Sequence, residues 1–310
     1  MSINQNSDLR VNLQKFAWLS IVVSVVVFGM KIAAWSVTGS VGLLSDALES
    51  TVNIVAAVVA LFAIRAAMKP ADAVHHFGRG KAEYFSAQIE GFMILFAALI
   101  IVYTAIERII NPRELESIGW GLTISTVAAV VNGGTAMILL RTGKQHRSPA
   151  LVADGKHLLT DVWTSVGVIV GVGLVVLTGW QRLDGVVALA VGLNIVVTGV
   201  RLLRASTAGL MDKALPDEDH LKIVEVLQRH ESANVKFHAL QTREAGRERF
   251  VSMHVLVPGD WTIQKGHDLS EVIEAEIKAL LEHTTVSTHV EPLEDERSWA
   301  DEPEGQHRWI

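Results

Sequence analysis

Long apolar runs separated by short polar segments dominate the chain as far as Leu203. A helix needs about 20 apolar residues to cross a bilayer core of about 30 Å, and six runs approach that length. Their lengths favour membrane crossings over helices buried in a soluble core. The predicted spans are roughly Phe16–Val37, Val41–Ala66, Ala87–Ile109, Gly119–Leu140, Ala150–Leu177 and Leu183–Leu203. This part of the chain is expected to be an all-α, six-helix membrane bundle.

After Met211 the pattern becomes that of a small α+β domain of the ferredoxin-like or metallochaperone-like kind. A helix from Pro216 to His230 is followed by two strand-like segments, a second helix and a short third strand, in the order αββαβ. These later segments are Val235–Thr242, Phe250–Val257, about Lys265–Leu281 and Val286–Val290. We therefore expect an N-terminal segment over residues 1–15, the bundle over 16–210, the α+β domain over 211–292 and a disordered acidic tail over 293–310.

The amino-acid composition is that of a membrane protein, and it limits which side chains can bind a metal ion. Hydrophobic residues make up 50% of the chain and charged residues 19%, below the roughly 25% usual for soluble domains. The net charge of −6 offers no basic surface for nucleic acid, so none is expected as a partner. Because the chain contains no cysteine, any metal site must use His, Asp, Glu, Asn or water.

Basic residues predict the orientation of the bundle in the bilayer. They gather after the second, fourth and sixth spans and are sparse in the opposite loops, which places both termini in the cytoplasm. The cytoplasmic set is Arg65, Lys69, Arg79, Lys81, Arg141, Lys144, Arg147, Arg201 and Arg204. Lys31 lies inside the first span, where it is expected to snorkel toward the outer interface, with an intramembrane ion pair as the alternative.

Two spans carry polar trios with the same spacing. The second has Asp46, Glu49 and Asn53, and the fifth has Asp154, His157 and Asp161, so each trio lies on one helix face. The deeper residues, Glu49, Asn53, His157 and Asp161, can form a four-coordinate shell for a divalent cation. The alternative is interhelical hydrogen bonding. Asp46 and Asp154 lie nearer the helix ends and fit a cap or a water-filled vestibule, while Glu90 in the third span is a weaker candidate.

Three segments resemble the cation diffusion facilitator family, and most closely its bacterial zinc/iron efflux subtype. They are SVGLLSDALESTVN (40–53), PADAVHHFGRGKAE (70–83) and ADGKHLLTD (153–161). The resemblance implies a homodimer in the bacterial inner membrane. It also implies that metal binds between the second and fifth spans, at Glu49, Asn53, His157 and Asp161, and is exchanged for protons by alternating access.

The resemblance also shows where this sequence departs from the family pattern. Zinc carriers usually have His or Asp at position 49 and Asp at position 53, so Zn²⁺ is the first choice but Mn²⁺, Fe²⁺ and Co²⁺ stay possible. The family's loop site falls on Asp72 and His75, where Arg79 replaces a third ligand. That site is expected to be weak or absent. Lys81 and Asp212 match a family charge pair between protomers, although they could equally be two separate surface charges.

The α+β domain carries a second set of candidate ligands. His238, His254 and His289 lie on its three predicted strands, and Glu291 shares a strand face with His289. His267 opens the second predicted helix. The resemblance places a binuclear regulatory metal site on these five residues, and the alternative is that they are ordinary surface or core residues.

These observations favour a divalent metal/proton antiporter whose cytoplasmic domain senses metal. The runner-up is a membrane-anchored metal-sensing or metal-binding protein without transport. An enzyme such as an intramembrane metalloprotease is not favoured, because the chain has no His-Glu-x-x-His run.

Overall fold

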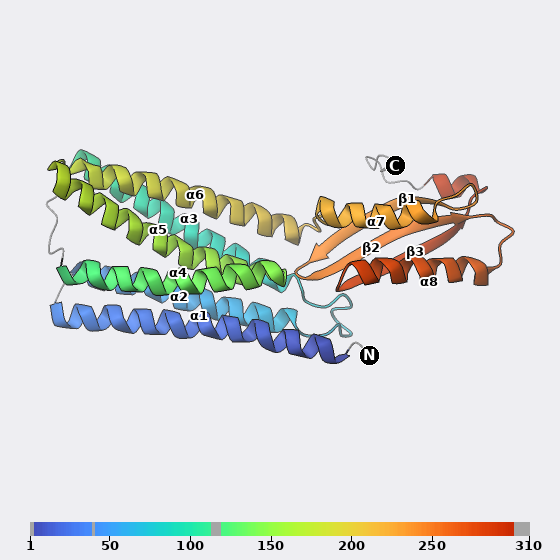
Figure 1. The fold of residues 1–310 in the computed structure, drawn as a ribbon, viewed down its shortest axis with the longest axis horizontal. Coiled ribbons are helices and arrows are strands. Elements are labelled where there is room, and N and C mark those ends of the chain that lie inside the picture. Colours follow the sequence, from blue (N-terminus) through green and yellow to red (C-terminus); the bar gives the residue numbers. More distant parts are fainter. Residues whose placement is uncertain (1–2, 39–40, 113–118, 301–310) are drawn as a thin grey trace. The chain divides into compact units, whose positions relative to one another are not determined.

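The computed structural model describes residues 3–38, 41–112 and 119–300. Within these ranges, the side chains of some helical residues, Asp46 and Glu49 among them, lie outside the description. The chain divides after Ala208 into two compact units. The first unit contains the helices α1 (Ile3–Thr38), α2 (Val41–Ala67), α3 (Ala82–Ile110), α4 (Gly119–Gln145), α5 (Pro149–Thr178) and α6 (Arg182–Leu210), labelled in Figure 1.

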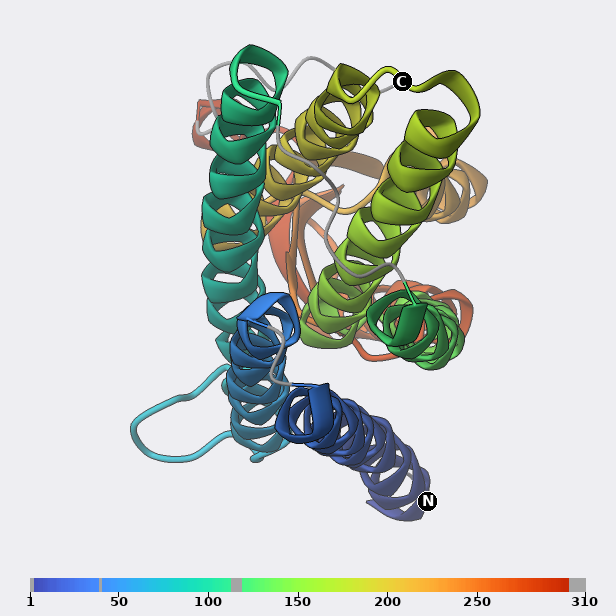
Figure 2. The same cartoon turned by 90° about the vertical axis from the view of Figure 1, so that its left-hand side faces the viewer.

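These six helices coincide with the six predicted runs. By length and composition, three segments of the described chain can cross a membrane: Leu13–Ala33, Ala82–Ile110 and Gly185–Leu210. A shorter apolar stretch, Asn53–Ala67, lies in α2. Helix α1 already begins at Ile3, well ahead of the predicted span. Figure 2 views the helices nearly end-on, with the loop between α2 and α3, coloured cyan, extending to one side.

Glycines set the close packing of α6 against α3. Gly185, Gly192 and Gly199 recur every seven residues along α6. A Cβ atom at Gly185 would lie 2.8 Å from Ile109 Cγ1, and one at Gly192 would lie 2.9 Å from Val102 Cγ2. Small residues of this kind let membrane helices approach closely, where van der Waals contact replaces the hydrophobic effect as the driving force.

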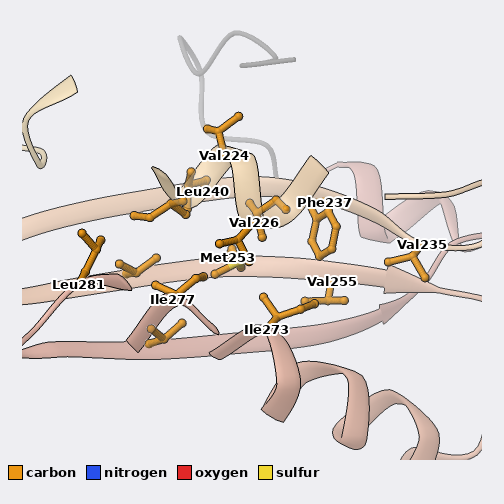
Figure 3. Packing of buried hydrophobic residues seen from close by; sticks show 14 of the residues in the cluster. Val224, Val226, Val235, Phe237, Leu240, Met253, Val255, Ile273, Ile277 and Leu281 are labelled. Atoms are coloured by element: carbon orange, nitrogen blue, oxygen red, sulfur yellow. The ribbon is translucent and has the colours of Figure 1, made fainter. Parts of the chain in front are cut away.

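The second unit is a sheet with two helices on one face. Strands β1 (Lys236–Ala245) and β2 (Glu248–Val257) are antiparallel, and β3 (Thr284–Pro292) runs parallel to β2. Helices α7 (Asp217–His230) and α8 (Ile263–Leu280) cover one face through a shared core. Figure 3 shows Val226 of α7 and Ile273 and Ile277 of α8 packed around Met253 and Val255 of β2. The predicted αββαβ order is confirmed.

A bulge in β1 reverses the alternation of side chains partway along the strand. The pairing register with β2 shifts between His238 and Gln241, and Ala239 has a φ of 50°. Phe237 and Leu240 therefore both enter the core although they are three residues apart. His238, between Phe237 and the bulge, points to the face that the helices leave uncovered.

The expectation of a disordered tail from residue 293 is wrong for its first residues. A short 3-10 helix, η1 (Glu296–Trp299), begins after Asp295, whose side chain accepts from the Arg297 backbone N–H. Trp299 Nε1 donates to the Leu293 carbonyl at 3.0 Å, and the Leu293 N–H donates to Val257 at 2.8 Å. These local hydrogen bonds hold the segment on the sheet despite its acidic composition. Residues 301–310 lie outside the described chain.

Candidate metal centres

A hydrogen-bonded network joins α2 and α5 inside the helical unit. Asn53 is 4% exposed and His157 is 5% exposed. His157 Nε2 donates to Asn53 Oδ1 at 2.7 Å, and Asn53 Nδ2 donates to Asp161 Oδ2. The structure thus brings together three of the four residues predicted for the intramembrane shell. Because His157 and Asp161 are one helical turn apart, both can reach the single Asn53 side chain on α2.

Asn132 of α4 extends this network, and the sequence interpretation had not singled it out. Its Nδ2 lies 3.4 Å from Asp161 Oδ2, so Asp161 accepts from two amides. The Asn132 side chain is buried, and its Oδ1 has no hydrogen-bond partner in the described chain. An amide in the middle of the fourth apolar run was the signal that could have identified it, because polar groups inside membrane spans call for a partner.

The remaining members of the two polar trios have different surroundings. The side chains of Asp46 and Glu49 lie outside the described residues. Asp154, expected at a cap or a vestibule, is instead only 1% exposed. The cap of α5 is formed by Ser148, whose hydroxyl accepts from the Leu151 N–H.

Lys31 is buried rather than snorkelling toward the interface. It is 6% exposed, and its Nζ donates to Ser50 Oγ at 2.8 Å. The acceptor lies on α2, next in sequence to Glu49. The ammonium group therefore finds a polar partner between α1 and α2, which removes the need to reach the headgroups.

Strand register brings three histidines into one row across the sheet. His254 on β2 is the Cα partner of His238 on β1 and of His289 on β3. The ring centroids of His238 and His254 are 4.8 Å apart, and those of His254 and His289 are 5.1 Å apart. All three side chains point away from the helix-covered face, since Met253 and Val255 on either side of His254 belong to the core.

The carboxylate of Glu291 lies among these imidazoles. Its Oε2 is 3.2 Å from His238 Nε2 and 3.1 Å from His254 Nδ1, and its Oε1 is 3.3 Å from His289 Nε2. Ligand atoms of His238, His254 and Glu291 all lie within 4.8 Å of one another. Two imidazoles and a carboxylate are a donor set that suits Zn²⁺ and other first-row divalent ions, so the residues fit a metal.

Trp299 borders this cluster, and His267 does not reach it. The Trp299 ring lies 5.7 Å from the His238 ring between centroids, so η1 helps to bury His238. Sequence reasoning missed Trp299 because the tail was expected to be disordered. His267 is exposed on α8, the helix that covers the other face of the sheet. No contact within the described part of this unit joins His267 to the other four predicted ligands.

In the loop between α2 and α3, the candidate ligand Asp72 already has other partners. Asp72 Oδ1 accepts from the N–H groups of Val74 and His75, and Arg79 forms an ion pair with Asp72 Oδ2 at 2.5 Å. The backbone donors, followed by Arg79, hold the pKa of Asp72 well below its usual range. His75 Nδ1 lies 3.4 Å from Asp72 Oδ1. A metal ion would have to displace the Arg79 guanidinium before it could use this carboxylate.

The two residues of the predicted charge pair belong to different units. Lys81 immediately precedes α3. Asp212 has a φ of 54° and accepts a hydrogen bond from Arg243 at 3.0 Å. Pairing of Lys81 with Asp212 between protomers stays a prediction.

Comparison with known proteins matches both units to family models. Residues 17–211 match the cation efflux transmembrane domain, and residues 215–293 match the cytoplasmic domain of cation efflux proteins. The two matched ranges meet close to the boundary between the two compact units.

Individual relatives are similar over most of the chain. An uncharacterised transporter of Synechocystis, sll1263, is 50% identical over 92% of each chain. The cation-efflux pump FieF of Citrobacter koseri is 30% identical over 85% of this chain and 87% of its own. A solved structure of the metal-bound C-terminal domain of the CzcD transporter from Thermotoga maritima is 29% identical. It covers 25% of this chain and 91% of its own, with a TM-score of 0.23.

Proposed function

Because the chain belongs to the cation diffusion facilitator family and is a divalent metal cation efflux protein, we propose that it is a metal/proton antiporter working by alternating access. Its transport ligands in this proposal are Glu49, Asn53, His157 and Asp161. Its natural place is the bacterial inner membrane, with both termini in the cytoplasm, in agreement with the distribution of Lys and Arg.

The observation that carries the proposal is the network that joins the buried Asn53 and His157 to the partly buried Asp161. These groups satisfy one another by hydrogen bonding, which makes them stable in an interior of low dielectric constant. A divalent ion would replace those hydrogen bonds with coordination to His157 Nε2 and to the side-chain oxygens of Asn53 and Asp161. A carboxylate at Glu49 would bring the formal charge of the shell to about −2, which balances the ion.

Metal binding at His157 requires a proton to move. In the hydrogen-bonded network Nε2 carries the proton that is donated to Asn53 Oδ1. A metal ion at Nε2 needs the free lone pair of a neutral imidazole, so an imidazolium ring must release its Nε2 proton, whereas in a neutral ring the proton only moves from Nε2 to Nδ1. Proton exchange at this ring therefore requires the imidazolium form as the metal-free state. His157 Nδ1 has no hydrogen-bond partner in the described chain. Competition between metal and proton at one ring is the simplest basis for antiport.

Zn²⁺ is the proposed first choice of substrate, with Mn²⁺, Fe²⁺ and Co²⁺ as alternatives. One imidazole and oxygen ligands can hold Zn²⁺. The amide of Asn53 and the longer carboxylate of Glu49 shift the shell toward hard oxygen donors, which also suit Mn²⁺ and Fe²⁺.

The sheet cluster is proposed as a regulatory site in a homodimer. A metal ion held by His238, His254, His289 and Glu291 would shift the equilibrium between transport states. The size of that shift is limited by the difference in the ion's affinity for those states. Equal activation of transport by metal in a His238→Ala/His254→Ala double variant would count against this role.

The test is transport in proteoliposomes with Zn²⁺, Mn²⁺, Fe²⁺ and Co²⁺ in competition, with internal pH recorded at the same time. We expect metal uptake accompanied by proton movement in the opposite direction and accelerated by an opposing pH gradient. Metal movement without proton movement would overturn the antiport mechanism. Comparison with Asn53→Asp would show whether this position sets the preference among metals.

A membrane-anchored metal sensor is the second candidate, because His238, His254 and Glu291 of one chain place three ligand atoms within 4.8 Å of one another. It predicts that Asp161→Ala leaves the metal content of cells unchanged, whereas the transporter proposal predicts metal accumulation. The sensor function gives no role to the buried network of α2, α4 and α5.

A further inference from the structure

Two carboxylic side chains that the proposed metal shell does not use lie buried between α3 and α5. Glu90 is 0% exposed and Asp154 is 1% exposed. The helices contact each other in an apolar cluster that contains Ala87 and Ile94 of α3 and Ala153 of α5. Both carboxyl groups are therefore held in a water-poor part of the helical unit.

These carboxyl groups have fewer hydrogen bonds than their oxygens require. Ser86 Oγ donates to Glu90 Oε1 at 3.2 Å. Glu90 Oε2 and both Asp154 oxygens have no hydrogen-bond partner in the described chain. Most buried polar atoms in proteins are paired, and Ser20 of α1 is the one hydroxyl among the described residues that acts on Asp154, so these carboxyl groups have little to stabilise a negative charge.

No cation of the described chain compensates the pair. Asp154 is the charged group that acts on Glu90. The polar side chain that faces Asp154 is Ser20 of α1. Lys156, two residues further along α5, is half-buried among the cations Lys144 and Arg201 and is not among the groups that act on Glu90 or Asp154. His157, the next ionisable group on α5, hydrogen-bonds to Asn53 of α2.

Electrostatics then decides the protonation of the pair. Two like charges in a buried site repel each other more strongly than they would in water, because the effective dielectric constant there is lower. Burial adds a desolvation cost for each charge. Two buried carboxyl groups whose charges act on each other therefore favour keeping a proton over ionising together.

We propose that Glu90 and Asp154 form a proton-binding site of the transporter, separate from the metal ligands. On release, one carboxyl O–H bond breaks, its electron pair stays on the oxygen as carboxylate, and the proton passes to water. On uptake the reverse occurs on the opposite side of the membrane. Asp154 lies three residues before His157 on the same face of α5. A movement of α5 on metal binding therefore also changes the position of the Asp154 side chain relative to α3. This inference rests on the proposed antiport.

The test uses the full-length protein and the isosteric variants Glu90→Gln and Asp154→Asn. A matched control is Glu107→Gln, near the end of the same helix α3. The infrared spectrum of the wild type should contain the C=O stretch of a buried protonated carboxyl group, which the double variant loses and the control keeps. In proteoliposomes, each single variant should move fewer protons for each metal ion and show a flatter dependence of transport on pH.

Four outcomes separate the possibilities. If the wild type lacks the protonated-carboxyl band at neutral pH, the inference is wrong whether or not the variants fold. Unchanged proton-to-metal ratios and pH profiles in both variants, with wild-type antiport intact, overturn the inference and leave the proposed function standing. A lower number of bound Zn²⁺ ions in the variants would make the pair a metal site instead. If the wild type itself moves no protons, the proposed antiport fails.

Discussion

The two candidate metal centres differ in what holds their ligands in place. In the helical unit, Asn53, Asn132 and Asp161 belong to three helices whose backbones are hydrogen-bonded internally, so only side chains join them. In the sheet, His238, His254 and His289 belong to strands whose backbones are hydrogen-bonded to one another. The first arrangement depends on helix packing, and the second on strand register.

This difference indicates what each centre is suited to do. Helices that meet through side chains can shift against one another and so form or dismantle a shell, as a transported ion requires. A row of histidines in a paired sheet keeps its spacing, as a bound regulatory ion requires. Exposure does not separate the two centres in the same way. His238 of the sheet, 4% exposed, is as buried as His157, 5% exposed, whereas the side chain of His289 is 67% exposed.

The largest loss of transport is expected from Asp161→Ala. This variant removes the carboxylate that accepts hydrogen bonds from the Asn53 and Asn132 amides. Loss of a residue that only supports a metal ligand costs about 10–100-fold in affinity, so we expect transport to fall by at least about 100-fold. Metal flux into proteoliposomes measures this. The metal affinity of the sheet centre, followed by titration calorimetry on the same protein, should not change.

An exposed aspartate provides the control for this variant. Asp260→Ala, in the turn between β2 and α8, should transport as the wild type does. Flux in Asp161→Ala within about tenfold of the wild type would remove Asp161 from the transport shell.

His254→Ala should break the sheet centre and spare the helical one. This residue occupies the middle of the histidine row, so its loss should weaken metal binding to the sheet by about 10–100-fold. Transport at saturating metal should persist, while activation by metal is lost. His267→Ala, at a residue that does not reach the cluster, should weaken binding far less. An equal loss in the two variants would contradict the ligand set described here.

Asn53→Asp in the helical centre should change the selectivity among divalent metals rather than the rate of transport. An added carboxylate strengthens the donor set, and the gain is greater for Zn²⁺ than for Mn²⁺ because intrinsic affinities rise along the divalent series. We expect the preference for Zn²⁺ over Mn²⁺ to increase by about tenfold, equivalent to about 1.4 kcal/mol. Competition transport measures the ratio, and an unchanged ratio would place selectivity elsewhere.

The smallest effect is expected from Asn132→Leu. Its amide contacts Asp161 at 3.4 Å, which is long for a hydrogen bond, so its contribution should be about 1 kcal/mol or less. Transport should fall by only a few-fold, seen as a higher metal concentration for half-maximal flux. A loss as large as that of Asp161→Ala would show that Asn132 is itself a ligand.

The sequence predicted most of the fold because hydrophobic period and length are local properties. The six apolar runs became α1 to α6, and the αββαβ order followed from alternation, helical period and turn residues. The tail was mispredicted, since the contacts of Trp299 with Leu293 and His238 are invisible in an acidic composition. Lys31 was mispredicted for a similar reason, because its partner Ser50 lies on another helix.

By itself, the sequence determined which residue types are available for metal and on which helix face each trio lies, because helical spacing fixes both. It also identified the histidines on the three strands. Only the tertiary structure decided that His157 meets Asn53, that Asn132 joins them, and that a bulge at Ala239 leaves His238 outside the core beside His254. Those outcomes depend on helix packing and strand register, which arise from contacts between residues far apart in the chain.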